Sequence, residues 1–142
     1  MEFSISQSEH EYITVDVLGY ERSPVGELYD DNWLRIQIRV SVGGFRGNMS
    51  ASILTTDLIG FAVGLRSIFE KLSGSAEFST IEKQLSLRLL CDRTGHVSLS
   101  GSVSDHAGIG NRLEFSLRLD QSDIASSVRQ LDAITQTFPE RK

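Results

Sequence analysis

The stretch LYDDNWLRIQIRVSVGGFRG, Leu28 to Gly47, changes from an acidic loop to the most regular strand pattern of the chain. From Leu34 to Val42 every second residue is apolar, and the residues between them are arginine, glutamine or serine. Successive side chains of a strand point to opposite faces, so this period of two indicates a strand with one face against a core. The pattern predicts a sheet that is buried on one side.

A hairpin and two earlier strands surround this stretch. Gly43 and Gly44 give the backbone freedom for a tight reversal, and residues 45–53 alternate as a returning strand. Upstream, residues 3–5 and 12–18 predict a short edge strand and a longer strand. The first half of the chain is therefore expected to be an antiparallel sheet.

A helix follows the hairpin. The apolar spacing changes to 3.6 residues over 58–72, with Thr56 as the expected N-cap and Gly74 as the stop. Gly60 and Gly64 each weaken a helix by up to about 1 kcal/mol relative to alanine. We expect both glycines to allow close packing of the helix on the sheet.

The second half of the chain repeats this plan. Its expected elements are strands over residues 76–78, 85–89, 97–103 and 113–119 and a helix from Ser122 that ends before Pro139. Residues 33–73 and 84–138 form a weak internal repeat of a hairpin followed by a helix, within a single domain over 1–142. We predict an α+β fold: a two-layer sandwich of one mostly antiparallel sheet of six to eight strands with two helices on one face.

Composition narrows the class of protein. The chain has 142 residues and a net charge of -5. Residues 1–31 hold eight acidic side chains and one basic, and residues 32–142 hold eleven acidic and thirteen basic. Clustered acids would repel nucleic acid and attract a basic protein, although they could equally form a solvated face. The single cysteine, Cys91, and the lack of an apolar N-terminal run suggest a reducing cytoplasm and no membrane anchor.

The acidic loop over residues 19–32 is long for a connection without its own secondary structure. Such loops are often functional, but the sequence alone favours a mobile surface connection. Trp33, the only tryptophan, stands where this loop enters the strand. A large aromatic side chain beside carboxylates is a common binding anchor. The high average burial of tryptophan instead favours a role in covering the end of the core.

No motif points to catalysis, metal binding or a cofactor. The trio Cys91, His96 and Asp105 has the residue types of a hydrolase, but two of them flank one tight turn and need not converge. No cysteine or histidine pair has zinc spacing. Four arginines occupy polar strand positions without the aromatic residues that stack bases, which argues against nucleic acid: Arg35, Arg39, Arg88 and Arg118.

Eight short segments, in order, resemble the WapI-type immunity proteins of bacteria. These segments are LGYER, YDDNWL, VGGFRG, GSAEF, QLSLRL, DRTGHVSLSG, DHAGIGNRLEFSLRLDQ and QLDAITQTFP. The run from Tyr29 to Asp31 departs from the Tyr-Trp-Asp that the family more usually has, so the resemblance does not carry over one particular partner.

The resemblance implies an inhibitor without enzymatic activity that binds the C-terminal domain of a cognate toxin. We expect this inhibitor to be cytoplasmic and a monomer or weak dimer. For the eponymous type that toxin attacks transfer RNA, so a nuclease with a basic cleft is expected. From charge and loop position we nominate Glu27, Asp30, Asp31 and Trp33 as partner-binding residues. Two other classes stay open: a small acidic secretion-type chaperone, and a ligand-binding domain or enzyme of unknown substrate.

Overall fold

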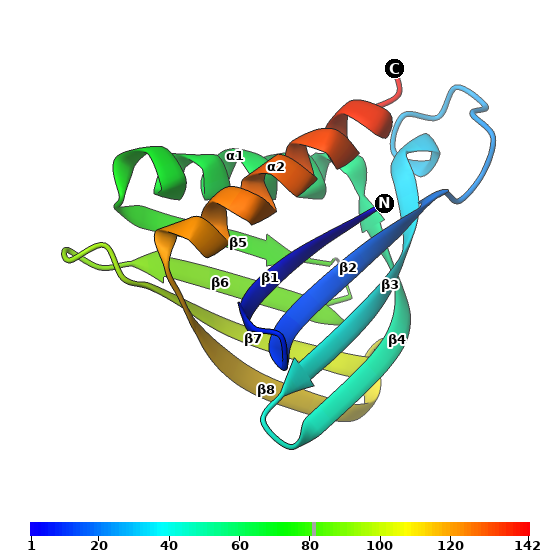
Figure 1. Cartoon of the computed structure of the whole chain (residues 1–142). Helices are drawn as coiled ribbons and strands as arrows, with labels where there is room; N and C mark the ends of the chain where they lie inside the picture. Colours follow the sequence, from blue (N-terminus) through cyan, green and yellow to red (C-terminus); the bar gives the residue numbers. More distant parts are fainter. Residues whose placement is uncertain (81) are drawn as a thin grey trace.

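The structure, a computed structural model, describes residues 1–80 and 82–142. The described residues form eight strands, two α-helices and a short 3-10 helix (Figure 1). The strands are β1 (Glu2–Ser8), β2 (Glu11–Tyr20), β3 (Trp33–Val42), β4 (Phe45–Leu54), β5 (Gly74–Ser79), β6 (Leu85–Cys91), β7 (Val97–His106) and β8 (Ile109–Leu119). The helices are η1 (Asp30–Asn32), α1 (Thr55–Lys71) and α2 (Gln121–Thr137).

The predicted α+β fold with antiparallel strands and two helices is confirmed, but the strands do not form one sheet. The first sheet has the order β1-β2-β3-β4 and the second β5-β6-β7-β8, each with antiparallel neighbours. Both helices lie across the same side of the two sheets (Figure 1). The sheets are separate because α1 connects β4 to β5 and packs along β5, so β5 begins a second meander.

Strand β3 alternates between buried and outward-facing side chains, as its sequence predicts. Leu34, Ile36, Ile38 and Val40 are buried, and the side chains between them face outward. Ile38 lies opposite Met49 in β4 and opposite Val15 in β2, so apolar rows run across the sheet. This register turns one face of the first sheet toward the core.

One core joins both sheets to the helices. Phe3 of β1, Phe61 of α1 and Phe78 of β5 form an aromatic cluster, with ring centroids 5.2 to 6.5 Å apart. Leu131 and Ile134 of α2 belong to the same buried cluster. Among the described residues, no helix has the length and apolar character needed to cross a membrane.

Helix α2 also covers the edge of β1. The backbone N–H of Ser4 donates to Gln130 Oε1 at 2.8 Å, and Ser127 Oγ donates to the Ser4 carbonyl at 2.6 Å. An uncovered edge strand is a template for pairing with other chains. These side chains of α2 occupy the edge groups at Ser4, so no further strand can pair there.

The ends of α1 differ from the prediction. The helix begins at Thr55 after the extended Leu54, and no side chain caps it, so Thr56 is not its N-cap. It ends at Lys71, where Leu72 takes the left-handed conformation with φ 52°, and Gly74 instead begins β5.

The two helix glycines also differ. A Cβ on Gly64 would lie 3.0 Å from the Cβ of Ala76 in β5, so α1 approaches the sheet closely there as expected. A Cβ on Gly60 would have no atom within 4 Å, and the expected packing role of Gly60 is wrong.

Candidate functional site

The loop between β2 and β3 is built around Asp31. Its carboxylate accepts hydrogen bonds from the backbone N–H groups of Val25, Gly26 and Glu27 at 2.8 to 3.1 Å. The Arg22 guanidinium donates to it at 3.3 Å. Burial alone raises the pKa of Asp31, but the N–H donors and Arg22 together outweigh burial, so the pKa lies below its usual value. The charged carboxylate holds the loop in one conformation.

Asn32 fixes the loop to the rest of the molecule. Its side-chain oxygen accepts from the Thr55 hydroxyl at 3.0 Å and from the Arg141 N–H at 2.7 Å. Its amide donates to the carbonyls of Leu28 and Arg141, the latter at 3.0 Å. This buried amide thus makes four hydrogen bonds that connect the loop, the start of α1 and the C-terminal residues.

The C-terminal residues brace the base of the loop from the other side. The Arg141 guanidinium lies 3.5 Å over the ring of Tyr20 and donates to the Arg22 carbonyl at 2.9 Å. Tyr20 also packs edge-on against Phe138 and donates to the Pro139 carbonyl. In Figure 1 the C-terminus lies beside the loop. The loop is therefore a supported part of the fold.

The four nominated residues divide into exposed and buried. The side chains of Glu27 and Asp30 are 69% and 49% exposed, each 3.8 Å from Arg22. Trp33 is half-buried and packs edge-on against Tyr29, with centroids 5.8 Å apart. Asp31 is only 4% exposed and its carboxylate is used within the chain, so it cannot form part of an exposed contact.

The acidic residues of the first 31 positions do not form one patch. Glu2 pairs with Arg39 at 2.9 Å on the outer face of the first sheet, where Glu2 also lies opposite Asp16. The loop acids instead share Arg22. The acidic side chains of residues 1–31 are therefore divided between the first sheet and the loop.

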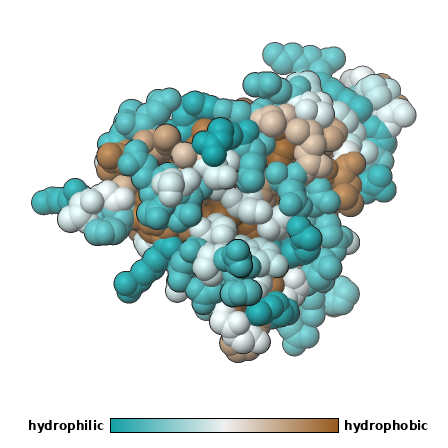
Figure 2. Space-filling view, viewed as in Figure 1, coloured by the Kyte–Doolittle hydropathy of each residue, from teal (hydrophilic) through white to brown (hydrophobic). Residues whose placement is uncertain are grey.

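Exposed apolar side chains of the loop were not predicted. Val25, Leu28 and Tyr29 are 66%, 55% and 58% exposed. Apolar residues reach the surface at this end of the molecule, at the upper right of Figure 2, among hydrophilic neighbours. The signal that could have found them is the presence of apolar residues inside an acidic loop. We call Val25, Glu27, Leu28, Tyr29, Asp30 and Trp33 the loop surface.

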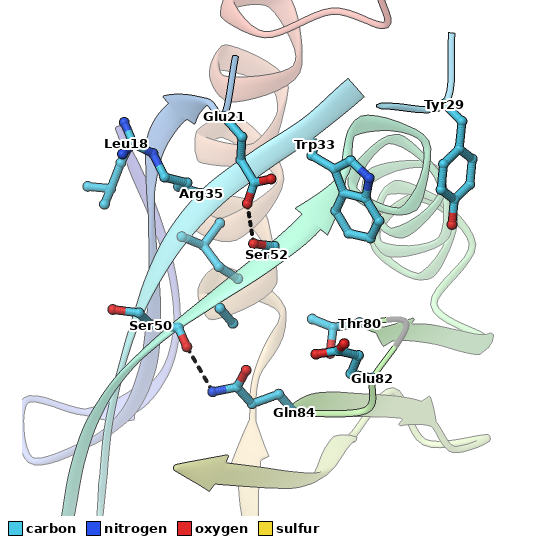
Figure 3. Close-up of a pocket in the computed structure, with 12 residues that line it drawn as sticks. Leu18, Glu21, Tyr29, Trp33, Arg35, Ser50, Ser52, Thr80, Glu82 and Gln84 are labelled. Atoms are coloured by element: carbon cyan, nitrogen blue, oxygen red, sulfur yellow. Dashed lines mark hydrogen bonds between the residues drawn. The ribbon is translucent and has the colours of Figure 1, made fainter. Parts of the chain in front are cut away.

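A cleft of about 740 Å³ adjoins the loop surface. Tyr29 and Trp33 line one end, β3 and β4 supply the floor, and Thr80, Glu82 and Gln84 supply the facing wall (Figure 3). Gln84 donates to the Ser50 carbonyl at 2.8 Å and so connects this wall to β4.

The three residues considered for a hydrolase site do not lie together. His96 precedes β7 and Asp105 lies near its far end, and at about 3.3 Å per residue they are about 30 Å apart. Asp105 accepts hydrogen bonds from Asn111, and His96 contacts the Thr94 hydroxyl. Cys91, His96 and Asp105 therefore do not form one site.

The four outward arginines do not form one face. Arg35 and Arg39 are in the first sheet, and Arg88 and Arg118 are in the second. Arg88 faces Glu77 at 3.5 Å.

A sequence profile of the Immunity protein WapI-like family matches residues 4–139. The chain belongs to the immunity protein WapI-like family. This membership supports an immunity function, which means binding to a cognate toxin protein. A search of curated proteins finds no match to this WapI-like chain.

Two solved structures align with nearly the whole of this chain. A crystal structure of Trypanosoma brucei MRP1/MRP2 superposes with a TM-score of 0.50 at 10% identity, covering 98% of this WapI-like chain and 85% of that chain. The plant transcriptional regulator PBF-2 gives a TM-score of 0.49 at 15% identity, covering 100% and 90%. At such low identity the first likeness concerns the fold alone.

Proposed function

We propose that this protein neutralises the C-terminal domain of a cognate toxin by seating the loop surface over the toxin's active site. The toxin is a nuclease in this proposal, because a nuclease presents a basic cleft that carboxylates can complement. The protein acts in the cytoplasm as a non-catalytic inhibitor. The observation that carries the proposal is a braced loop on which exposed apolar side chains lie beside carboxylates.

The apolar residues of the loop surface supply the contact. Energetic hot spots are aromatic and apolar side chains that become fully desolvated at the centre of an interface. Leu28 and Tyr29 are exposed directly before η1, and Trp33 packs edge-on against Tyr29. Desolvating Leu28 and Tyr29 against a partner would give the complex its slow dissociation.

The rigidity of the loop favours tight binding. A disordered loop would have to be ordered on binding, at a cost of about 0.5 to 1.5 kcal/mol for each side chain immobilised. Here Asp31 and Asn32 already hold the backbone through hydrogen bonds. The loop surface can thus dock without a large loss of conformational entropy.

The carboxylates of the loop surface affect the association rate. Glu27 and Asp30 share only Arg22 as a counter-charge within 4 Å among the described residues, so part of their field extends into solvent. Fields of this kind steer a basic partner, and salt screens them over about 8 Å at physiological ionic strength.

The test measures association with the cognate toxin domain by stopped-flow at low and high salt. The double variant Glu27→Lys, Asp30→Lys should associate about tenfold more slowly at low salt, and the difference should shrink at high salt. The control is Glu9→Lys, which reverses one charge away from the loop surface. Glu9 is exposed at the β1–β2 turn and forms no ion pair with another described residue. An unchanged association rate in the double variant rejects this surface as the docking site.

Solution mass separates the proposal from a secretion-type chaperone. A chaperone of this size is expected to be a stable homodimer, whereas the inhibitor is expected to be a monomer or weak dimer that forms a one-to-one complex with the toxin. Light scattering with and without toxin distinguishes the two.

A further inference from the structure

We infer that the cleft beside the loop surface is a receptor for an arginine side chain of the partner. The supporting features are a concave site, an aromatic pair at one end and carboxylates on two sides. Assigning this arginine to the toxin rests on the proposed function, whereas the existence of the receptor does not.

The shape of the cleft suits a long side chain and the backbone that carries it. Its volume of about 740 Å³ lies within the range of about 300 to 1,000 Å³ that is usual for ligand sites. Ala51 and Trp33 are half-buried in the lining and offer apolar surface that can cover the methylene groups of an arginine. A small anion would leave the apolar surface of Ala51 and Trp33 uncovered.

The charged groups of the cleft favour a cation at one end. Glu21 and Glu82 line it, and Arg35 is its basic side chain. Figure 3 shows Arg35 beside Leu18 at one end, with Trp33 and Glu82 on facing sides toward the other. Glu82 forms no ion pair within the described residues, so its charge is available to a partner. A cation between Trp33 and Glu82 is therefore stabilised and lies away from Arg35.

Arginine suits this end better than lysine. A planar guanidinium can stack on an aromatic face and donate two parallel hydrogen bonds to a carboxylate, which an ammonium group cannot do. The edge-on contact between Tyr29 and Trp33 fixes the two rings, and Glu82 supplies a carboxylate on the facing wall.

The receptor can be tested without the toxin. The probe is the peptide acetyl-Gly-Arg-Gly-amide, and the matched control replaces arginine by citrulline, which has nearly the same shape without the charge. Binding is followed by NMR through the indole N–H of Trp33, the only tryptophan. We expect a saturable shift with a Kd of about 1 mM for the arginine peptide and at least tenfold weaker binding of the citrulline peptide.

Variants locate the peptide. Glu82→Gln should weaken binding of the arginine peptide at least fivefold, and Glu9→Gln, the same charge change at a distant turn, should leave it unchanged. Both positions are exposed, so both variants should fold, which urea unfolding checks. Equal binding of the two peptides, no saturation, or an unaffected Glu82→Gln variant would overturn the receptor.

The toxin complex separates this inference from the proposed function. If Glu82→Gln speeds toxin dissociation, the toxin contributes the arginine. If charge reversal at Glu27 and Asp30 slows association while Glu82→Gln leaves dissociation unchanged, the inhibitor function holds and the assignment of the arginine to the toxin fails.

Discussion

Removing the Asn32 side chain should destabilise the whole protein and release the loop. Asn32→Ala deletes four hydrogen bonds and leaves the Thr55 hydroxyl and the backbone groups of Leu28 and Arg141 without their partner. At about 0.5 to 1.5 kcal/mol for each bond, the free energy of unfolding should fall by about 3 kcal/mol. Because Trp33 is the next residue, its fluorescence should report the looser loop in the folded state.

The assay is urea unfolding followed by Trp33 fluorescence and by far-UV circular dichroism. With an m-value of about 2 kcal/mol/M, the midpoint should fall by about 1.5 M. Asn48→Ala is the matched control, because Asn48 is exposed on β4 and loses only one solvent-exposed hydrogen bond, from Gln37, which should cost less than about 0.5 kcal/mol. If Asn32→Ala unfolds within about 0.5 kcal/mol of the unsubstituted protein, the four bonds do not brace the loop as argued.

Two further outcomes follow from other contacts. Gly60→Ala should raise the free energy of unfolding by about 0.5 to 1 kcal/mol, because alanine has the higher helix propensity. Gly64→Ala should lower the free energy of unfolding by about 1 kcal/mol, because the added Cβ crowds Ala76. Urea unfolding measures both, and equal stabilisation by the two variants would contradict this packing. Asp31 has a lowered pKa, so its stabilisation is present above the unfolded value of about 3.9 and is lost as pH falls through the lower folded value. The stability gap between the unsubstituted protein and Asp31→Asn should therefore shrink below about pH 4, and a gap independent of pH would argue against a charged Asp31.

The site was only partly predictable for a physical reason. The loop and Trp33 could be predicted as a candidate site, because a long acidic connection before a strand can be recognised from the sequence alone. The sequence could not tell Asp30 from Asp31, which are neighbours with the same side chain. The backbone turns at η1, so Asp31 faces the N–H groups of residues 25–27 while Asp30 faces solvent. The cleft could not be predicted, because its walls come from segments about fifty residues apart in the sequence.

The sequence by itself determined the strands, the helices and the side of each that is buried, since alternation and the 3.6-residue spacing act on near neighbours. The tertiary structure alone decided that the strands form two sheets, because strand pairing depends on how α1 packs on β5 and on which edges remain free. It also decided which acids are available to a partner. Glu2 is paired with Arg39, Asp31 is buried in its own loop, and Glu27 is left exposed, because charge is neutralised by proximity in space.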